Sequence, residues 1–169
     1  MFLNEITLNT KIFIDANIFV YHFSAGSIFN KSCTDFLAEV EAKKFQGFTS
    51  TAVVQEAIHR LMMVEASSVL DTEVKNLPKY LKLHPDVVKE LKKHLIIPSK
   101  ISSLNIEIIQ ITPKLIEESQ DLKTEYGFLT NDALTLKIMK DLNIIAIASN
   151  DLDFRRVDWL NLYLPVPTS

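Results

Sequence analysis

The sequence predicts an α/β protein in three layers, an α/β/α sandwich with a central parallel sheet between two layers of helices. Three observations support this: short apolar runs typical of strands buried on both faces, amphipathic helical stripes, and the regular alternation of the two. Parallel strands are usually joined by a helix, so the alternation favours a parallel sheet. The 169 residues are enough to bury a core, and we expect one domain over residues 1–169.

The first half of the chain predicts strand, helix, strand and helix. These elements are expected at residues 11–15, 30–44, 47–49 and from residue 50 onward. Ile12, Phe13 and Ile14 follow one another in the first strand, as in a strand with no exposed face. Ser50 or Thr51 is expected to cap the second helix.

The second half repeats the pattern after an inserted section. Residues 70–105 contain Pro78, Pro85 and Pro98, which break the rhythm, and we expect a helical insertion there. A strand is expected at residues 106–111 and a helix at residues 113–127. A second helix is expected to begin with Thr130 or Asn131 as its cap. A buried strand at residues 144–148 and an edge strand at residues 161–164 follow.

The composition is that of an ordinary globular protein, with 47% hydrophobic and 23% charged residues. No apolar run approaches the roughly 20 residues that a membrane helix needs, so we expect a cytoplasmic protein with no membrane association. The single cysteine, Cys33, is expected to be a small buried side chain. The net charge of -3 lacks the basic excess of many nucleic-acid binders, but acids gathered in a metal site would lower this total.

Four acids are predicted to meet at one edge of the sheet. Asp15 closes the first strand, and Glu56 lies in the first turns of the helix after the second strand. Asp132 opens a later helix, and Asp151 follows the last buried strand. In parallel α/β sheets, ligands bind outside the carboxyl ends of the strands, because loops and helix N-termini converge there.

Several carboxylates in one place repel one another, and a divalent cation is the usual remedy. Oxygen ligands without thiolates or a convincing histidine pair favour Mg²⁺ or Mn²⁺, which retain waters and accept phosphate oxygens. Such a site activates a bound water and stabilises in-line displacement at phosphorus. The sequence therefore indicates phosphodiester hydrolysis.

Each acid also has a structural explanation. Asp15 could end its strand in an Asx turn, and Glu56 could form a surface pair with Arg60, four residues later on the same helix. Asp132 could serve the dipole of its helix, and Asp151 could be a turn residue. These explanations must hold four times independently, whereas one metal site accounts for all four acids.

Three segments resemble the acidic motifs of PIN domains. They are Ile-Asp-Ala-Asn-Ile-Phe at residues 14–19, Asn-Asp-Ala-Leu at residues 131–134, and Ile-Ala-Ser-Asn-Asp-Leu-Asp-Phe at residues 147–154. The resemblance implies that the catalytic, metal-binding acids are Asp15, Glu56, Asp132 and Asp151. It implies supporting roles for Asn17, Ser149 and Asp153.

The resemblance is closest to the small VapC-like toxins of toxin–antitoxin pairs. It implies a three-layer fold, dependence on Mg²⁺ or Mn²⁺, endonucleolytic cleavage of RNA, homodimerisation and inhibition by an antitoxin protein. The alternative is a PIN-like module that binds RNA or a protein without cleaving. The section at residues 70–105 is longer than in the minimal toxins.

Basic residues gather in two places. The inserted section carries Lys75, Lys79, Lys82, Lys89, Lys92, Lys93 and Lys100. These lysines form either a surface that contacts RNA or a partner, or a solvated helical face. Arg155 and Arg156 follow the last acidic motif and either contact phosphate or pair with nearby acids.

Other catalytic classes fit less well. Glu56 and His59 form one E-x-x-H step, but a di-iron bundle needs two steps on antiparallel helices. A phosphoacceptor domain of the response-regulator kind requires an acidic pair at the first strand, where this chain has one acid, Asp15. The three glycines are too dispersed for a phosphate-binding loop.

Overall fold

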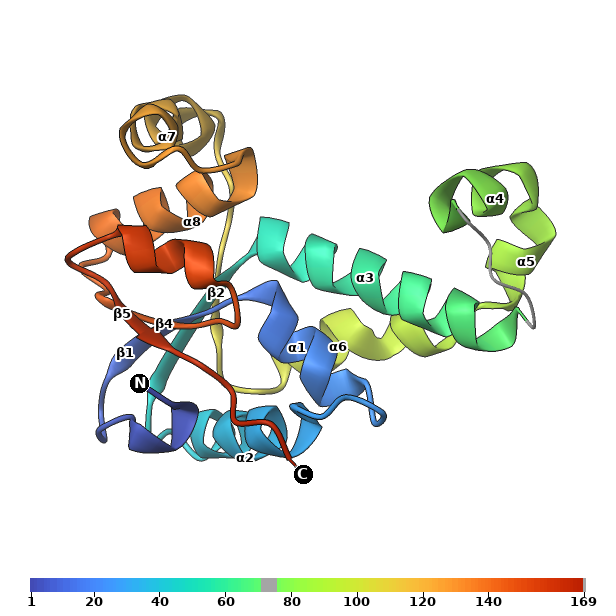
Figure 1. Cartoon of the computed structure of the whole chain (residues 1–169), viewed down its shortest axis with the longest axis horizontal. Coiled ribbons are helices and arrows are strands. Elements are labelled where there is room, and N and C mark those ends of the chain that lie inside the picture. The colour runs from blue at the N-terminus through green and yellow to red at the C-terminus, as the bar shows by residue number, and fades with distance from the viewer. Residues whose placement is uncertain (71–75, 169) are drawn as a thin grey trace.

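The computed structural model describes residues 1–70 and 76–168 and has a five-stranded sheet at its centre (Figure 1). The strand order is β3-β2-β1-β4-β5, and all neighbouring strands are parallel. The strands are β1 (Lys11–Ile14), β2 (Gln46–Ser50), β3 (Glu107–Ile109), β4 (Ala146–Ala148) and β5 (Asn161–Tyr163). The predicted parallel α/β sheet and the edge position of the last strand are confirmed.

Helices cover both faces of this sheet (Figure 1). On one face lie α1 (Ala16–Phe23), α2 (Asn30–Glu41), α3 (Thr51–Val69) and α6 (Ile97–Ser102). On the other face lie α7 (Pro113–Tyr126) and α8 (Thr130–Asp141). The remaining helical elements are η1 (Leu3–Glu5), α4 (Leu77–Leu83), α5 (Pro85–Glu90), η2 (Lys93–Ile96) and η3 (Leu152–Arg156). The three-layer architecture predicted from the sequence is confirmed.

Strand β1 is the centre of the core. Its Ile12, Phe13 and Ile14 have no exposed surface, as expected for a strand covered on both faces. The register places Ile14 beside Ala148 of β4. Because all the strands run the same way, their carboxyl ends lie along a single edge, and the residue after Ile14 is Asp15.

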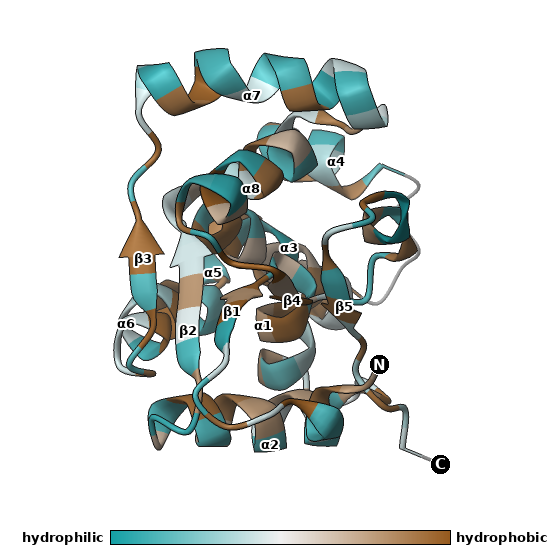
Figure 2. Ribbon diagram, turned by 90° about the vertical axis from the view of Figure 1, so that its left-hand side faces the viewer, coloured by the Kyte–Doolittle hydropathy of each residue, from teal (hydrophilic) through white to brown (hydrophobic). Residues whose placement is uncertain are grey.

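Helix α1 was not predicted from the sequence. Its first five residues are all buried, so it has no exposed face to create an amphipathic stripe. Figure 2 shows that α1 is hydrophobic along most of its length, whereas α7, on the outside, is largely hydrophilic. A buried helix following a buried strand looks in sequence like one continuous apolar run.

The helix caps were predicted with mixed success. Ser50 caps α3 by accepting a hydrogen bond from the backbone N–H of Val53, as expected. The prediction that Thr130 or Asn131 caps α8 was wrong: the N-cap is Leu129, which makes no side-chain cap. The two polar side chains bind elsewhere, the hydroxyl of Thr130 to Lys123 and the amide of Asn131 to Glu56.

Several element boundaries also differ from the predictions. Helix α2 ends at Glu41 rather than at residue 44, since Lys43 adopts a left-handed conformation with φ of 59°. The last two strands and β3 are shorter than the apolar runs that predicted them. Hydrophobic residues beyond the ends of these strands are buried without extending the pairing, as Ile144 and Ile106 show.

The predicted insertion at residues 70–105 is helical where the structure describes it, and it packs in two parts. Ile97 and Ile101 of α6 join the main core. Residues 76–96, called the arm below, pack with the end of α3 around a separate small core. The buried residues of this core are Ala66, Leu81 and Leu91. Figure 1 shows α4 and α5 projecting with the end of α3 away from the sheet.

A buried carboxylate fastens the arm to α3. Glu65 is only 7% exposed, and its oxygens accept hydrogen bonds from the backbone N–H groups of Lys92, Lys93 and His94 at 2.7–3.2 Å. The ring Nδ1 of His94 lies 3.1 Å from the same carboxylate. Burial raises the pKa of Glu65, but the donors outweigh it and hold the pKa at about 2. The carboxylate is therefore charged and satisfied.

Two expectations about residue environments can also be compared with the structure. Cys33 has no exposed surface, and burial raises the pKa of its thiol to about 12, in agreement with a structural role. Among the described residues, no helix has the length and apolar character needed to cross a membrane.

We expect Glu65→Gln to lower the free energy of unfolding by about 2–4 kcal/mol at pH 7, because three backbone donors lose a charged acceptor. The folded-state pKa of Glu65 is depressed from 4.5 to about 2, so its contribution is complete above pH 4.5 and is lost as the pH falls towards 2. Urea unfolding at several pH values measures both effects. Glu90→Gln, at an exposed position on α5, is the control, and equal losses in the two variants would contradict the role of Glu65.

Candidate active site

Asp15 stands between β1 and α1 at the carboxyl edge of the sheet. It is the N-cap of α1, and its Oδ1 accepts a hydrogen bond of 2.7 Å from the backbone N–H of Ala16. This is a local turn role of the kind considered for Asp15 from the sequence. The rest of its environment goes beyond such a turn.

The second oxygen of Asp15 is held by side chains from two elements. Asn17 Nδ2 donates to Asp15 Oδ2 at 2.5 Å, and Ser149 Oγ donates to the same oxygen at 2.6 Å. Ser149 is fully buried, and its Oγ also accepts from Asn17 Nδ2 and from the backbone N–H of Asp151, both at 3.0 Å. Asn17 and Ser149 thus both contact Asp15 directly, and their supporting roles stay a prediction.

Only one acceptor position of Asp15 remains free of these bonds. An ionised carboxylate offers about four lone-pair positions, two on each oxygen. Oδ2 uses both with Asn17 and Ser149, and Oδ1 uses one with Ala16. The remaining position, on Oδ1, is available to a ligand. Desolvation by burial raises the pKa of Asp15 in spite of these donors, and the nearby charge of Glu56 raises it further.

Glu56 reaches this site from the second turn of α3. Asn131 Nδ2 of α8 donates to Glu56 Oε2 at 3.2 Å, and Arg60 lies 3.6 Å from Oε1. The helical pair with Arg60 considered from the sequence is therefore present. The bond from Asn131, which links helices on opposite faces of the sheet, also fixes Glu56 close to Asp132.

The charge of Asp132 is poorly compensated. Its pKa is raised to about 6. Burial is the largest cause, and the negative charges of nearby acids raise the pKa further, namely Asp15, Asp151, Glu56 and Asp153. No hydrogen bond to the Asp132 carboxylate is found among residues 1–70 and 76–168. The four acids selected from the sequence therefore lie within electrostatic reach of one another at one edge.

The last acidic segment is held by local contacts. Asp151 caps η3 by accepting from the backbone N–H of Asp153 at 2.9 Å. Asp153 forms an ion pair of 2.6 Å with Arg156, whose guanidinium also lies over the ring of Phe128 at 5.5 Å. Arg156 therefore pairs with a nearby acid, the second of the two roles considered for it. Arg155 is exposed.

Helix N-termini oppose the repulsion among these acids. Helices α1, α3 and α8 all begin at this edge, with Asp15 as the N-cap of α1 and Asp132 in the first turn of α8. The N-terminus of a helix carries a partial positive charge, which stabilises nearby carboxylates. Burial and the neighbouring acids nevertheless raise the pKa of Asp132.

The donor set fits a hard divalent cation. Across the two described stretches of the chain, no three His, Cys, Asp or Glu side chains are arranged so that they could hold one ion together. Mg²⁺ does not require such a cage, since it usually keeps several waters and binds one or two carboxylates plus phosphate oxygens. The free position on Asp15 and the uncompensated charge of Asp132 are suitable for this kind of binding.

Some contacts of the site were not expected. The hydroxyl of Tyr21 accepts a hydrogen bond of 3.2 Å from the side chain of Asn150, whose backbone N–H donates to Asn17 Oδ1 at 3.0 Å. No sequence signal pointed to Tyr21, because it lies on the unpredicted helix α1. Asn131 was part of a recognised motif, but its contact with Glu56 joins residues 75 positions apart.

A cavity of about 620 Å³ lies elsewhere, between η1, α2 and the C-terminal residues. Its walls are mainly apolar and include Leu3, Phe36, Phe45 and Val166. None of the clustered acids lines it, so we assign the chemistry to the edge of the sheet.

The chain matches a known family over most of its length. The PIN domain matches residues 12–160. The chain is 29% identical to Ribonuclease VapC2 of Methanocaldococcus jannaschii over 153 residues, which cover 90% of this chain and 92% of that protein.

Solved structures of low sequence identity share the fold. VapC20 of Mycobacterium tuberculosis, a sarcin-ricin loop cleaving toxin, superposes with a TM-score of 0.62 at 14% identity, covering 88% of this chain and 95% of that chain. VapBC2 of Rickettsia felis, bound to a DNA fragment from its promoter, gives 0.56 at 17% identity, covering 93% and 100%.

We expect Asp132→Asn to stabilise the metal-free protein by about 1–2 kcal/mol at pH 8, because it removes a charge that the folded state disfavours. The folded-state pKa of Asp132 is raised from 3.8 to about 6, so the wild type gains stability as the pH falls through this range and the variant does not. Thermal unfolding in chelator measures the difference. Asp121→Asn on the exposed face of α7 is the control, and a destabilised Asp132→Asn would contradict the repulsion.

Proposed function

This chain belongs to the PIN domain family, and we propose that it is a metal-dependent endoribonuclease that hydrolyses phosphodiester bonds in RNA. One observation carries the proposal: Asp15, oriented by Asn17 and Ser149, shares one edge of the sheet with Glu56, Asp132 and Asp151. Burial and then the neighbouring acids raise the pKa of Asp132. A scaffold that holds like charges together against repulsion is suited to a divalent cation. The relative from Methanocaldococcus jannaschii, a ribonuclease, supports RNA as the substrate.

The proposed roles follow from the contacts of each residue. Asp15 presents the free position of Oδ1 to the cation, and Ser149 and Asn17 prevent its carboxylate from rotating. Asp132, Asp151 and Glu56 supply the remaining negative charge, with Asn131 holding Glu56 towards α8. Arg155, exposed beside the last motif, contacts phosphate, whereas Arg156 orients Asp153.

A bound Mg²⁺ or Mn²⁺ lowers the pKa of a water and neutralises charge that develops on the phosphate in an in-line displacement. The protein itself provides oriented carboxylates and the positive ends of three helices at this edge of the sheet. The buried Ser149 and Asn17 keep the support of Asp15 out of contact with solvent.

The proposal extends to the biological setting. We propose that the chain is a cytoplasmic toxin that an antitoxin protein holds inactive, as the resemblance to the VapC-like toxins implies. We further propose that the chain forms a homodimer, as its resemblance to the VapC-like toxins implies. A PIN-like module that binds RNA or a protein without cleaving is the alternative, and the cleavage assay distinguishes the two.

We expect the purified protein to cut RNA in Mg²⁺ or Mn²⁺ and to be inactive in chelator, because the clustered acids need a cation. Asp15→Asn is expected to reduce cleavage to background, since it alters the acid whose free position is oriented by Asn17 and Ser149. Gel analysis of an end-labelled RNA measures both. Equal cleavage by the variant or in chelator would contradict the assigned site, and intact RNA under all conditions would favour the non-cleaving alternative.

Ser149→Ala is expected to reduce cleavage about 10–100-fold, as is usual when the residue that orients a metal ligand is lost. The variant removes the short bond to Asp15 Oδ2 and the acceptor for Asp151 N–H. Initial rates at saturating Mn²⁺ separate a loss of rate from a loss of metal affinity. Ser103→Ala, at an exposed position after α6, is the control, and unchanged rates in Ser149→Ala would contradict its positioning role.

A further inference from the structure

We propose that the arm, residues 76–96, is a second RNA-binding surface that holds the substrate backbone at a fixed distance from the carboxylates. This inference rests on the proposed function and adds a minimum length for the RNA substrate. The arm was predicted only as a helical insertion, and its lysines were left open between a binding surface and a solvated face.

Charge is distributed unevenly along the chain. The arm has five lysines and two acids, a formal charge of +3, whereas the whole chain carries -3 and the remaining residues therefore sum to -6. All five lysines are exposed, namely Lys79, Lys82, Lys89, Lys92 and Lys93. Lys75, also part of the predicted basic set, lies outside the described residues.

Most of these lysines make no ion pair. Lys89 pairs with Asp86 at 2.8 Å, but no acidic side chain pairs with the other four within the part of the chain that the structure describes. Exposed lysines without acidic partners create a positive surface, which attracts phosphates and releases their counterions on binding. The net charge of the whole chain, -3, does not reveal this positive surface.

Aromatic rings lie among the lysines. The ring of Tyr80 on α4 and the ring of His84, the C-cap of α4, have centroids 4.1 Å apart at an interplanar angle of 31°, and His84 is exposed. Lys79 and Lys82 alternate with them along the helix. Basic residues that track a backbone, together with rings on which bases stack, are the usual combination in proteins that bind nucleic acid without strong sequence preference.

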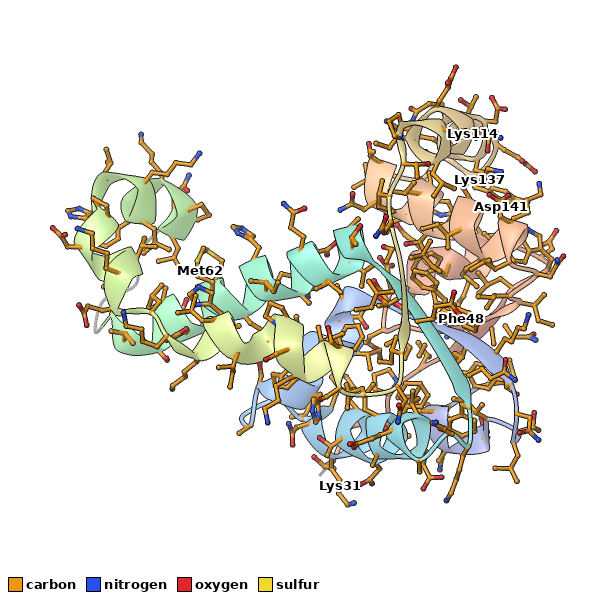
Figure 3. The ribbon with its side chains drawn as sticks, turned by 180° about the vertical axis from the view of Figure 1, so that it is seen from behind. Lys31, Phe48, Met62, Lys114, Lys137 and Asp141 are labelled. Carbon is orange, nitrogen blue, oxygen red and sulfur yellow. The ribbon has the colours of Figure 1, made fainter. Side chains whose placement is uncertain are left out.

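The arm is rigidly placed relative to the acids. Helix α3 runs without interruption from Thr51 to Val69, so Glu56 near its start and Ala66 in the small core are about 15 Å apart at 1.5 Å per residue. Glu65 fastens η2 to the same helix through three backbone bonds. Figure 3 shows Met62 where the arm joins α3, far from Lys114 and Lys137 at the α7–α8 end.

Helix α4 of the arm lies on the same side of α3 as α8, whose first turn carries Asp132 (Figure 1). Figure 1 shows α4 rising at one end of α3 and α8 at the other, both on the same side of it. A distance of about 15 Å corresponds to four or five base steps at roughly 3.4 Å each. An RNA cut at the carboxylates must therefore extend at least this far on one side to reach the lysines of the arm.

The test compares the triple variant Lys79→Gln/Lys82→Gln/Lys93→Gln with Lys31→Gln/Lys43→Gln/Lys44→Gln, which alters three exposed lysines on or after α2. Lys31 lies on the side of the molecule opposite α7 and α8 (Figure 3). Neither set alters the acids of the site, and Lys93→Gln changes only a side chain and keeps the backbone N–H that binds Glu65. Binding to a labelled stem–loop RNA is measured in chelator, so that no cleavage is needed, over a range of salt concentrations.

The plot of log affinity against log salt concentration has a negative slope, and the arm variant is expected to reduce its magnitude by about two, at roughly 0.7–0.9 for each lost phosphate contact. The control variant is expected to leave the slope unchanged. His84→Ala is expected to weaken binding about fivefold or more without changing the slope, as for a lost stacking contact. Cleavage of a tetranucleotide in Mn²⁺ should be unaffected by either change, because it cannot reach the arm.

Equal salt slopes in the arm variant and the wild type would overturn the proposal, and the lysines would then serve a protein partner or solvent. Equal slope changes in the two triple variants would overturn it as well, since the effect would then come from overall charge. Failure of the ribonuclease assignment appears separately, as an absence of cleavage with metal while the binding differences persist.

Discussion

Repulsion among carboxylates at the carboxyl edge of a parallel sheet is the constraint on which the site depends. Strand β1, buried on both faces, fixes the position of Asp15, and β4 brings Ser149 and Asp151 beside it. The hydrogen bonds to Asp15 and the three helix N-termini offset part of the repulsion, but Asp132 retains a pKa of about 6. The fold therefore holds an unfavourable interaction that the proposed cation would relieve, and such perturbed groups gather at functional sites.

Much of this arrangement follows from the order of elements in the sequence. Asp15 and Asp151 follow buried strands, and Asp132 begins a helix, so a parallel sheet alone places them at one edge. The bond between Glu56 and Asn131 could not be predicted, because it depends on how helices from opposite faces approach each other. Helix α1 was missed for a related reason: burial on all sides removes the periodicity by which a helix is recognised.

The inserted section shows the same limit of prediction from sequence. Its prolines correctly indicated short helices, but they did not show that α6 joins the main core while the arm forms its own. The residue that joins the arm to the rest, Glu65, looks in sequence like an ordinary helical glutamate. Its role depends on backbone N–H groups that only the folded chain turns towards it. Contacts to the backbone leave no trace in residue type.

Helix α3 connects the two features, with an acid of the site near its start and the lysines of the arm near its end. A metal-free cluster of acids repels a phosphate backbone, whereas the arm attracts it, so the two ends have opposite effects on RNA. Under the two proposals, RNA binding and RNA cleavage are separable properties of the two ends of α3, and only cleavage requires the cation. Net charge averages these regions and for that reason says little about whether a chain of this kind binds nucleic acid.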